Sequence, residues 1–145
     1  MELEILKDAY DTEARLLEKL CSCLQQERDC LIAGRVRDLW PLREQKERIC
    51  GQLKVQEKII KEQSGEILKR GQKVSMEWII SSKKRIRNLK GEAASRSSEN
   101  MKIVKDMLDF IDGLIDAIMS PEVQSHDYGR TQRMISYPRI LFKEA

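Results

Sequence analysis

The sequence predicts an all-α protein with a long antiparallel helical hairpin, a third long helix that completes a three-helix bundle or coiled coil, and a flexible C-terminal tail. Charged residues make up 35% of the 145 residues and aromatic residues only 5%, which favours long exposed helices. Seven Gly and three Pro are too few for the many turns of a β-sandwich or barrel. Apolar residues also recur at heptad spacing, which indicates helices that share a narrow seam.

The first helix is expected over residues 2–33. Two carboxylates, Glu13 and Glu27, occupy seam positions that are usually apolar, so the seam is imperfect. Gly34 follows the last apolar residues and predicts the end of the helix, because glycine readily adopts the left-handed conformation of a C-terminal cap. The heptad itself consists of Leu3, Tyr10, Leu17, Leu24 and Leu31.

The second helix is expected over residues 38–64. Asp38 is a candidate N-cap, and Pro41 falls in the first turn, where its missing N–H costs little. The short connection to the first helix requires an antiparallel hairpin. The pattern weakens at Ser64 and Gly65, so we expect the next turn over residues 64–74. The apolar series is Leu39, Leu42, Ile49, Leu53, Ile60 and Ile67, with Lys46, Gln56 and Gln63 as polar interruptions.

The third helix is expected over residues 75–119, starting near a possible N-cap at Ser75 and ending before Pro121. Residues 95–100 are poor helix formers, so the sequence leaves open whether this helix is continuous. Residues 121–145 show no helical period except for a short apolar cluster. We therefore expect one helical domain over residues 1–120 and a flexible binding tail over residues 121–145.

Charge is unevenly distributed along the chain. Residues 1–33 carry four basic and eight acidic groups, whereas residues 34–91 carry sixteen basic and seven acidic groups. Opposite charges on neighbouring helices favour their packing and fix their register. The basic run over residues 83–90 is expected to be solvated and to pair with the acidic first helix, and the net charge of +3 does not favour nucleic-acid binding.

No catalytic or cofactor motif is visible. The one histidine, His126, lies beside Asp127 without a nucleophile, and no glycine-rich phosphate loop occurs. We therefore expect no enzyme activity, no cofactor and no metal. Four aspartates at helical spacing are interpreted as a solvated face that could alternatively receive a basic partner; they are Asp106, Asp109, Asp112 and Asp116. The cysteines are expected to be reduced and to act as small apolar residues, and they are Cys21, Cys23, Cys30 and Cys50.

The sequence predicts a cytoplasmic protein without stable membrane insertion. No apolar run approaches the length of a membrane span, and Met1-Glu2-Leu3-Glu4 lacks the features of a secretory signal. A monomer or weak dimer is expected.

The hairpin over residues 13–53 resembles the flagellar export chaperones of the FlgN family. Members share a long acidic first helix, a turn around glycine, and a second helix with the rhythm that Leu39, Leu42, Lys46 and Ile49 show here. Glu99-Asn100 leading into the apolar stripe of the third helix also fits, as does Tyr128-Gly129-Arg130 at the start of the tail. The similarity covers essentially the whole chain.

The resemblance implies a chaperone that binds the helical ends of hook-associated proteins, prevents their premature assembly and delivers them to the flagellar export gate. Amphipathic helices with incomplete seams can accept a partner helix, which agrees with this role. The alternatives are a homo-oligomeric structural coiled coil and a basic helical nucleic-acid adaptor. For the third helix, ordinary bundle core is an equally good interpretation. The predicted partner surface comprises Val104, Leu108, Ile111, Ile115, Tyr128, Met134, Ile135, Tyr137, Ile140, Leu141 and Phe142.

Overall fold

A computed structural model describes residues 2–71 and 76–123 of the chain. Its elements are α1 (Glu2–Ala33), a short 3-10 helix η1 (Val36–Asp38), α2 (Leu39–Lys69) and α3 (Met76–Val123). The described residues contain helices and turns only, which confirms the all-α class. The chain divides into two compact units, Met1–Arg96 and Ser97–Ala145, and α3 contributes to both.

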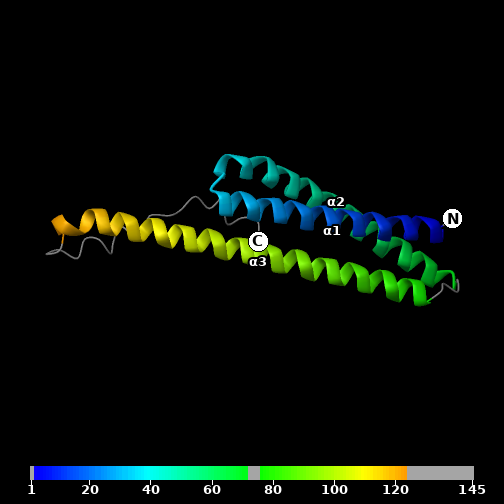
Figure 1. Cartoon of the computed structure of the whole chain (residues 1–145). Helices are drawn as coiled ribbons and strands as arrows, with labels where there is room; N and C mark the ends of the chain where they lie inside the picture. The colour runs from blue at the N-terminus through cyan, green and yellow to red at the C-terminus, as the bar shows by residue number, and fades with distance from the viewer. Residues whose placement is uncertain (1, 72–75, 124–145) are drawn as a thin grey trace. The chain divides into compact units, whose positions relative to one another are not determined.

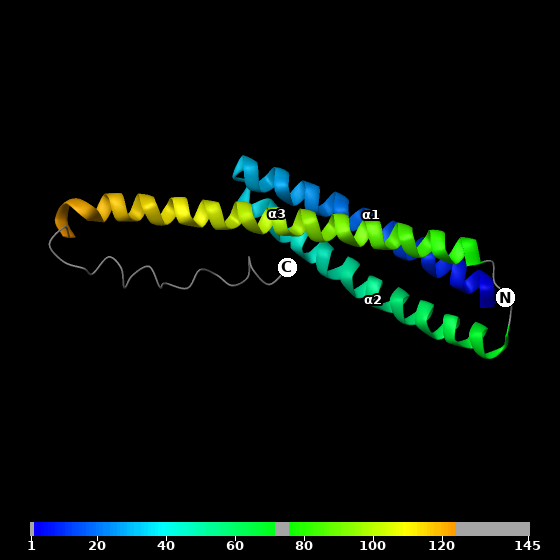
Figure 2. The same ribbon diagram turned by 90° about the horizontal axis from the view of Figure 1, so that it is seen from below.

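In the first unit, α1 and α2 form an antiparallel hairpin that is visible in both ribbon views (Figures 1 and 2). Residues 76–96 of α3 pack against this pair and run antiparallel to α2 (Figure 1). The largest core cluster combines side chains from all three helices, namely Leu6, Tyr10, Leu16, Leu17, Ile49, Leu53, Ile67 and Ile86. The heptad residues of the first two helices therefore supply most of the core.

The turn after α1 forms where the sequence predicts it. Gly34 adopts a left-handed backbone with φ of 71°. The Gly34 N–H donates to the Leu31 carbonyl at 3.2 Å, and the Arg35 N–H donates to the Cys30 carbonyl at 2.9 Å. These two bonds satisfy carbonyls at the end of the helix in the Schellman arrangement. Asp38 occupies the N-cap position of α2, but its side chain makes no capping hydrogen bond and instead lies 3.8 Å from Arg35.

The second helix extends five residues beyond its expected end at residue 64. Gly65 lies inside α2, and the helix ends at Lys69, with Gly71 in the left-handed conformation. Ile67 explains the extension, because it is only 4% exposed and joins the largest core cluster. Burial of an isoleucine side chain contributes about 1.5–3 kcal/mol, which exceeds the cost of about 1 kcal/mol for a glycine within a helix.

The third helix is continuous through residues 95–100, which resolves the question that the sequence left open. Ser95 and Ser98 are exposed, whereas Ala93 and Asn100 on either side of them are buried. A serine in an exposed helical position costs less than about 1 kcal/mol relative to alanine. This small cost does not break a helix that is anchored by buried residues. α3 continues past its expected end at residue 119 and past Pro121 to Val123, so residues 121–123 of the expected tail are helical. The N-cap predicted at Ser75 and the rest of the tail predicted over residues 121–145 lie outside the described residues.

Candidate functional site

Two features could serve a function: a polar seam inside the first unit and an exposed apolar face on the second part of α3. The seam is formed by charged residues at positions where the heptad pattern calls for apolar ones. Glu13 is 3% exposed and Lys46 is 6% exposed. Such burial of charge is costly unless each group is paired.

The structure pairs these charges across helices. Lys46 of α2 donates a hydrogen bond to Glu27 of α1 and forms an ion pair with it. Lys90 of α3 lies 3.6 Å from Glu13 of α1 and 2.8 Å from Glu57 of α2. A neighbouring helix therefore supplies an opposite charge to each charged seam residue, namely Glu13, Glu27 and Lys46, and these pairs link all three helices of the first unit.

Burial and pairing shift the pKa values of these groups. Burial raises the pKa of Glu13, and the nearby Lys90 ammonium opposes that shift. The hydrogen bond from Lys90 to Glu57 raises the pKa of Lys90. Burial also raises the pKa of the Cys21 thiol, which disfavours the reactive thiolate. These arrangements suit register and stability, and they present no nucleophile beside a base.

The basic run over residues 83–90 divides between two environments. Arg85 donates a hydrogen bond to Glu18 of α1 at 2.8 Å, and Lys90 joins the polar seam. The predicted pairing with the acidic first helix is thus confirmed for these two residues. Lys83 and Arg87 are exposed and line a cavity of the first unit.

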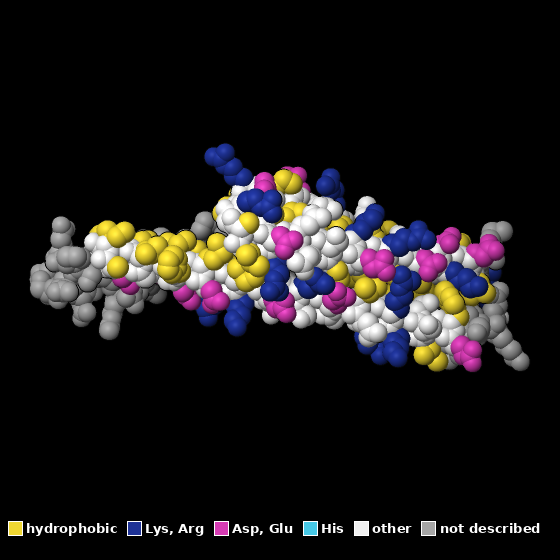
Figure 3. All heavy atoms as spheres, viewed as in Figure 1, with side chains coloured by type: hydrophobic (Ala, Val, Ile, Leu, Met, Phe, Trp, Pro, Cys, Tyr) yellow, Lys and Arg dark blue, Asp and Glu magenta, His cyan; other side chains and the backbone are white. Residues whose placement is uncertain are grey.

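The second candidate feature is a face of α3 that we call the α3 apolar face. Isoleucine and phenylalanine side chains are normally buried, yet Phe110 is 68% exposed and Ile118 is 76% exposed. Figure 3 shows apolar side chains gathered along this part of α3. The face consists of Phe110, Ile111, Leu114, Ile115, Ile118 and Met119.

The spacing of these residues places them on one half of the helix circumference, since each residue advances by about 100°. Asp106 and Asp109 are exposed, whereas Asp112 and Asp116 are partly exposed. The four aspartates occupy the opposite half, as expected for a solvated face. The second part of α3 is therefore an amphipathic helix whose apolar side lies largely open in the described residues.

The predicted partner residues on α3 have different environments. Ile111 and Ile115 are 45% and 51% exposed, Leu108 is partly buried, and Val104 is buried with 8% exposure. Phe110, Leu114, Ile118 and Met119 were missing from the predicted surface, although their spacing from Ile111 and Ile115 was the signal for them. The predicted tail residues and His126 lie outside the described part of the chain; those tail residues are Tyr128, Met134, Ile135, Tyr137, Ile140, Leu141 and Phe142.

Two further findings concern metal ions and membranes. Within residues 2–71 and 76–123, no cluster of three or more His, Cys, Asp or Glu side chains could hold a metal ion. In the same ranges, no helix has the length and hydropathy needed to cross a membrane.

Comparison with known proteins identifies the family. The family described as FlgN protein matches residues 1–135, which includes the hairpin, all of α3 and much of the tail. No curated protein and no solved structure matches the chain. The family match confirms the resemblance that the hairpin shows in sequence. The chain belongs to the FlgN family of flagellar export chaperones.

Proposed function

We propose that this protein binds hook-associated proteins of the hook–filament junction in the cytoplasm, prevents their premature assembly and delivers them to the flagellar export gate. One observation carries the proposal. In a member of an export chaperone family, six large apolar side chains lie exposed on one side of a single helix. Contiguous apolar surface of this kind typically marks a protein interaction site.

The proposed binding mode is a helix packed against a helix. Exposed apolar residues at spacings of three and four can interlock with the apolar side of an amphipathic client helix. Burial of Ile111 and Ile115 against the client would contribute several kcal/mol in total, since each fully buried side chain contributes about 1.5–3 kcal/mol. A client helix held in this way could not pair with other copies of the client, which explains how binding would prevent assembly.

The test compares two variants of the full chain for binding to a purified hook-associated protein from the same bacterium. Ile111→Asp combined with Ile115→Asp places two carboxylates on the apolar face, and we expect affinity to fall at least tenfold, about 1.4 kcal/mol. Lys105→Asp is the matched control, because it introduces an aspartate at an exposed position on the opposite side of the helix. Titration calorimetry measures both. Equal affinity for the double variant and the control would contradict the proposal.

The tail is the second part of the proposed client surface. Its six large apolar side chains from Met134 to Phe142 occur in a segment that is otherwise mostly polar. We expect Ile140→Ser combined with Leu141→Ser to weaken client binding without changing the unfolding of the helical part. A one-to-one complex by light scattering is also expected. Unchanged client affinity in the tail variant would remove the tail from the binding surface.

A further inference from the structure

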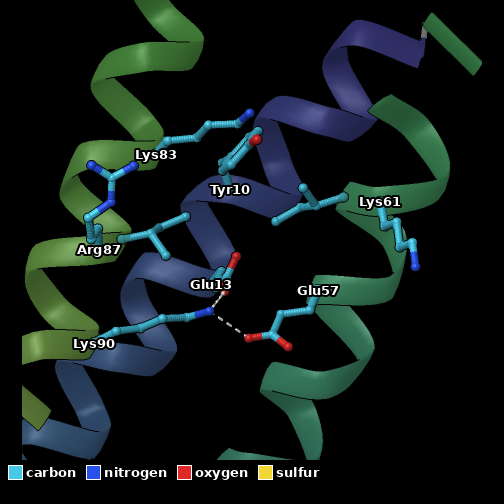
Figure 4. Close-up of a pocket in the computed structure, with 9 residues that line it drawn as sticks. Tyr10, Glu13, Glu57, Lys61, Lys83, Arg87 and Lys90 are labelled. Carbon is cyan, nitrogen blue, oxygen red and sulfur yellow. Dashed lines mark hydrogen bonds and ion pairs between the residues drawn. The ribbon is translucent and has the colours of Figure 1, made fainter. Parts of the chain in front are cut away.

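The first unit contains a cavity of about 410 Å³, and none of the residues that line it belongs to the proposed client surface. It lies between α2 and the first part of α3, with α1 behind it (Figure 4). We call this cavity the α2–α3 groove. It forms entirely within residues 1–96, so its residues belong to one compact unit.

The groove has an apolar part formed by Tyr10, Ile60 and Ile86, one residue from each helix. Ile86 is 8% exposed, and Ile60 is partly buried against the same core cluster. Tyr10 is held in place by Trp78, whose ring meets it edge-on at a centroid distance of 5.5 Å. The floor of the groove is therefore apolar, and Ile60 is the one of these three side chains that is only partly buried.

The lining of the groove also carries an excess of positive charge. It includes four cations and two carboxylates, and Lys90 already pairs with both carboxylates, Glu13 and Glu57. Figure 4 shows these contacts crossing one end of the groove. The remaining cations, Lys61, Lys83 and Arg87, make no ion pair within the part of the chain that the structure describes.

These three cations lie on both sides of the apolar part. Lys61 extends from α2, whereas Lys83 and Arg87 extend from α3 and are separated by one helical turn. Elsewhere in the first unit, the exposed Arg85 and the partly exposed Arg96 donate hydrogen bonds to side chains of α1. Three cations without an ion pair in the described residues thus line the groove, where an acidic partner would meet both positive charge and apolar contact.

We propose that the α2–α3 groove docks an acidic amphipathic helix of a partner protein. Its apolar side chains would pack chiefly against the partly buried Ile60, above a floor formed by Tyr10 and Ile86, and its carboxylates would face the cations on both sides. A helix suits the groove because it can lie along α2 and α3 and add a fourth helix to the unit. The site lies on different residues from the α3 apolar face, so it goes beyond the proposed client surface.

A nucleic acid fits this groove less well than an acidic helix does. Nucleic-acid sites stack bases on exposed aromatic rings, whereas Tyr10 is only 5% exposed and packs against Trp78. The two carboxylates in the lining would also repel phosphates. An acidic helix can place its apolar residues next to these carboxylates and its own charges next to the cations.

The test uses a synthetic helical peptide with leucines on one side and flanking glutamates, labelled with a fluorophore, and the full chain at low ionic strength. Lys83→Glu combined with Arg87→Glu should weaken binding of this peptide at least tenfold. Lys84→Glu is the matched control, since Lys84 is exposed on the same helix turn but does not line the groove; its affinity should change less than twofold. Fluorescence anisotropy measures binding, and circular dichroism verifies that each variant is folded. Lys61→Glu provides an independent variant on α2 and should weaken binding in the same direction.

Several outcomes would overturn the proposal. Equal binding of the peptide to the double variant and the control would do so, as would equal binding of a peptide with lysines in place of the glutamates. Tighter binding of a twelve-nucleotide RNA than of the peptide, lost in the same variants, would assign the groove to nucleic acid. A dimer that dissociates only in the Lys83 and Arg87 variant would assign it to a second copy. The Ile111→Asp, Ile115→Asp variant should bind the peptide normally, so failure of this proposal and failure of the client surface can be distinguished.

Discussion

The two parts of α3 have similar amphipathic sequences but different environments. In the first part, Ile86 and Ala93 are buried in clusters that include residues of α1. In the second part, apolar side chains from Phe110 onward are exposed on one side of the helix. An amphipathic pattern predicts that a face will be covered, but it does not identify what covers it. Residues of α1 and α2 cover the first part. We propose that a client protein covers the apolar face of the second part.

The two regions also differ in how they treat charge. The first unit places Glu13, Glu27 and Lys46 in its seam and pairs each with an opposite charge from another helix. On the second part of α3, the aspartates lie on the side opposite the apolar face. Charge in the first unit therefore specifies which helices pack together, whereas charge on the second part of α3 leaves one continuous apolar side.

The largest expected effect comes from removing core volume in the first unit. Leu17 is 2% exposed and belongs to the largest core cluster. Leu17→Ala should lower the free energy of unfolding by about 2–5 kcal/mol, because it removes buried methyl groups and leaves a cavity. Urea denaturation followed by circular dichroism measures this loss. A change below about 1 kcal/mol would show that the packing around Leu17 is loose and would weaken the contrast between the regions.

The next largest effect is expected from the pair of Glu27 and Lys46, whose side chains are 14% and 7% exposed. Lys46→Ala removes this cation from Glu27, whose carboxylate is poorly solvated. The free energy of unfolding should therefore fall by about 2 kcal/mol. Arg43→Ala is the control, because its pair with Glu47 lies within one helix and Glu47 is 62% exposed; it should cost less than about 0.5 kcal/mol. Replacing both seam residues with leucine should restore most of the lost stability. Similar losses for Lys46→Ala and Arg43→Ala would contradict a structural role for the seam.

Much of the first unit was predictable from sequence because its signals are local or pairwise. The end of α1 at Gly34 was predictable because glycine readily adopts the left-handed backbone conformation. The heptad residues likewise predicted most of the core. Glu27 and Lys46 are individually irregular, but they have opposite signs on helices that a short turn forces into contact. The sequence therefore indicated that opposite charges would meet between these two helices, but it did not reveal which cation would meet which carboxylate.

The remaining features depend on tertiary packing that local propensity does not report. Gly65 indicated a turn, yet burial of Ile67 extends α2 past it. The serines over residues 95–98 left the continuity of the third helix open, and α3 continues through them. For the apolar residues of α3, helical periodicity gives the same expectation whether the face is core or surface. The sequence therefore did not predict their exposure, and it did not predict the groove that Lys61 lines together with Lys83 and Arg87.

A smaller effect concerns the pH dependence of the first unit. Burial raises the pKa of Glu13 above its ordinary value of 4.5, with Lys90 acting against the shift and Glu57 adding to it. A raised pKa means that the folded chain favours protonated Glu13. Its contribution to stability is complete below pH 4.5 and is lost as the pH rises through the folded pKa.

Glu13→Gln removes this titration while Lys90 keeps Glu57 as its partner at 2.8 Å. The stability of the variant relative to the natural protein should therefore increase as the pH is raised from about 4 to about 7. Urea denaturation at several pH values measures the difference. A difference that stays constant over this range, or that falls as the pH rises, would show that burial does not control the protonation of Glu13.

The smallest effect on the free energy of unfolding is expected for substitutions on the α3 apolar face, where side chains are exposed, in contrast to the buried Leu17. Phe110 is 68% exposed, so Phe110→Ser removes little buried area, and the two residues have similar helix propensities. The free energy of unfolding should change by less than about 0.5 kcal/mol, while binding of an environment-sensitive dye such as ANS should fall. A loss above about 1 kcal/mol would mean that Phe110 is covered in the free protein. In that case the apolar side of α3 would be core along its whole length, and a client would have to displace its cover before it could bind.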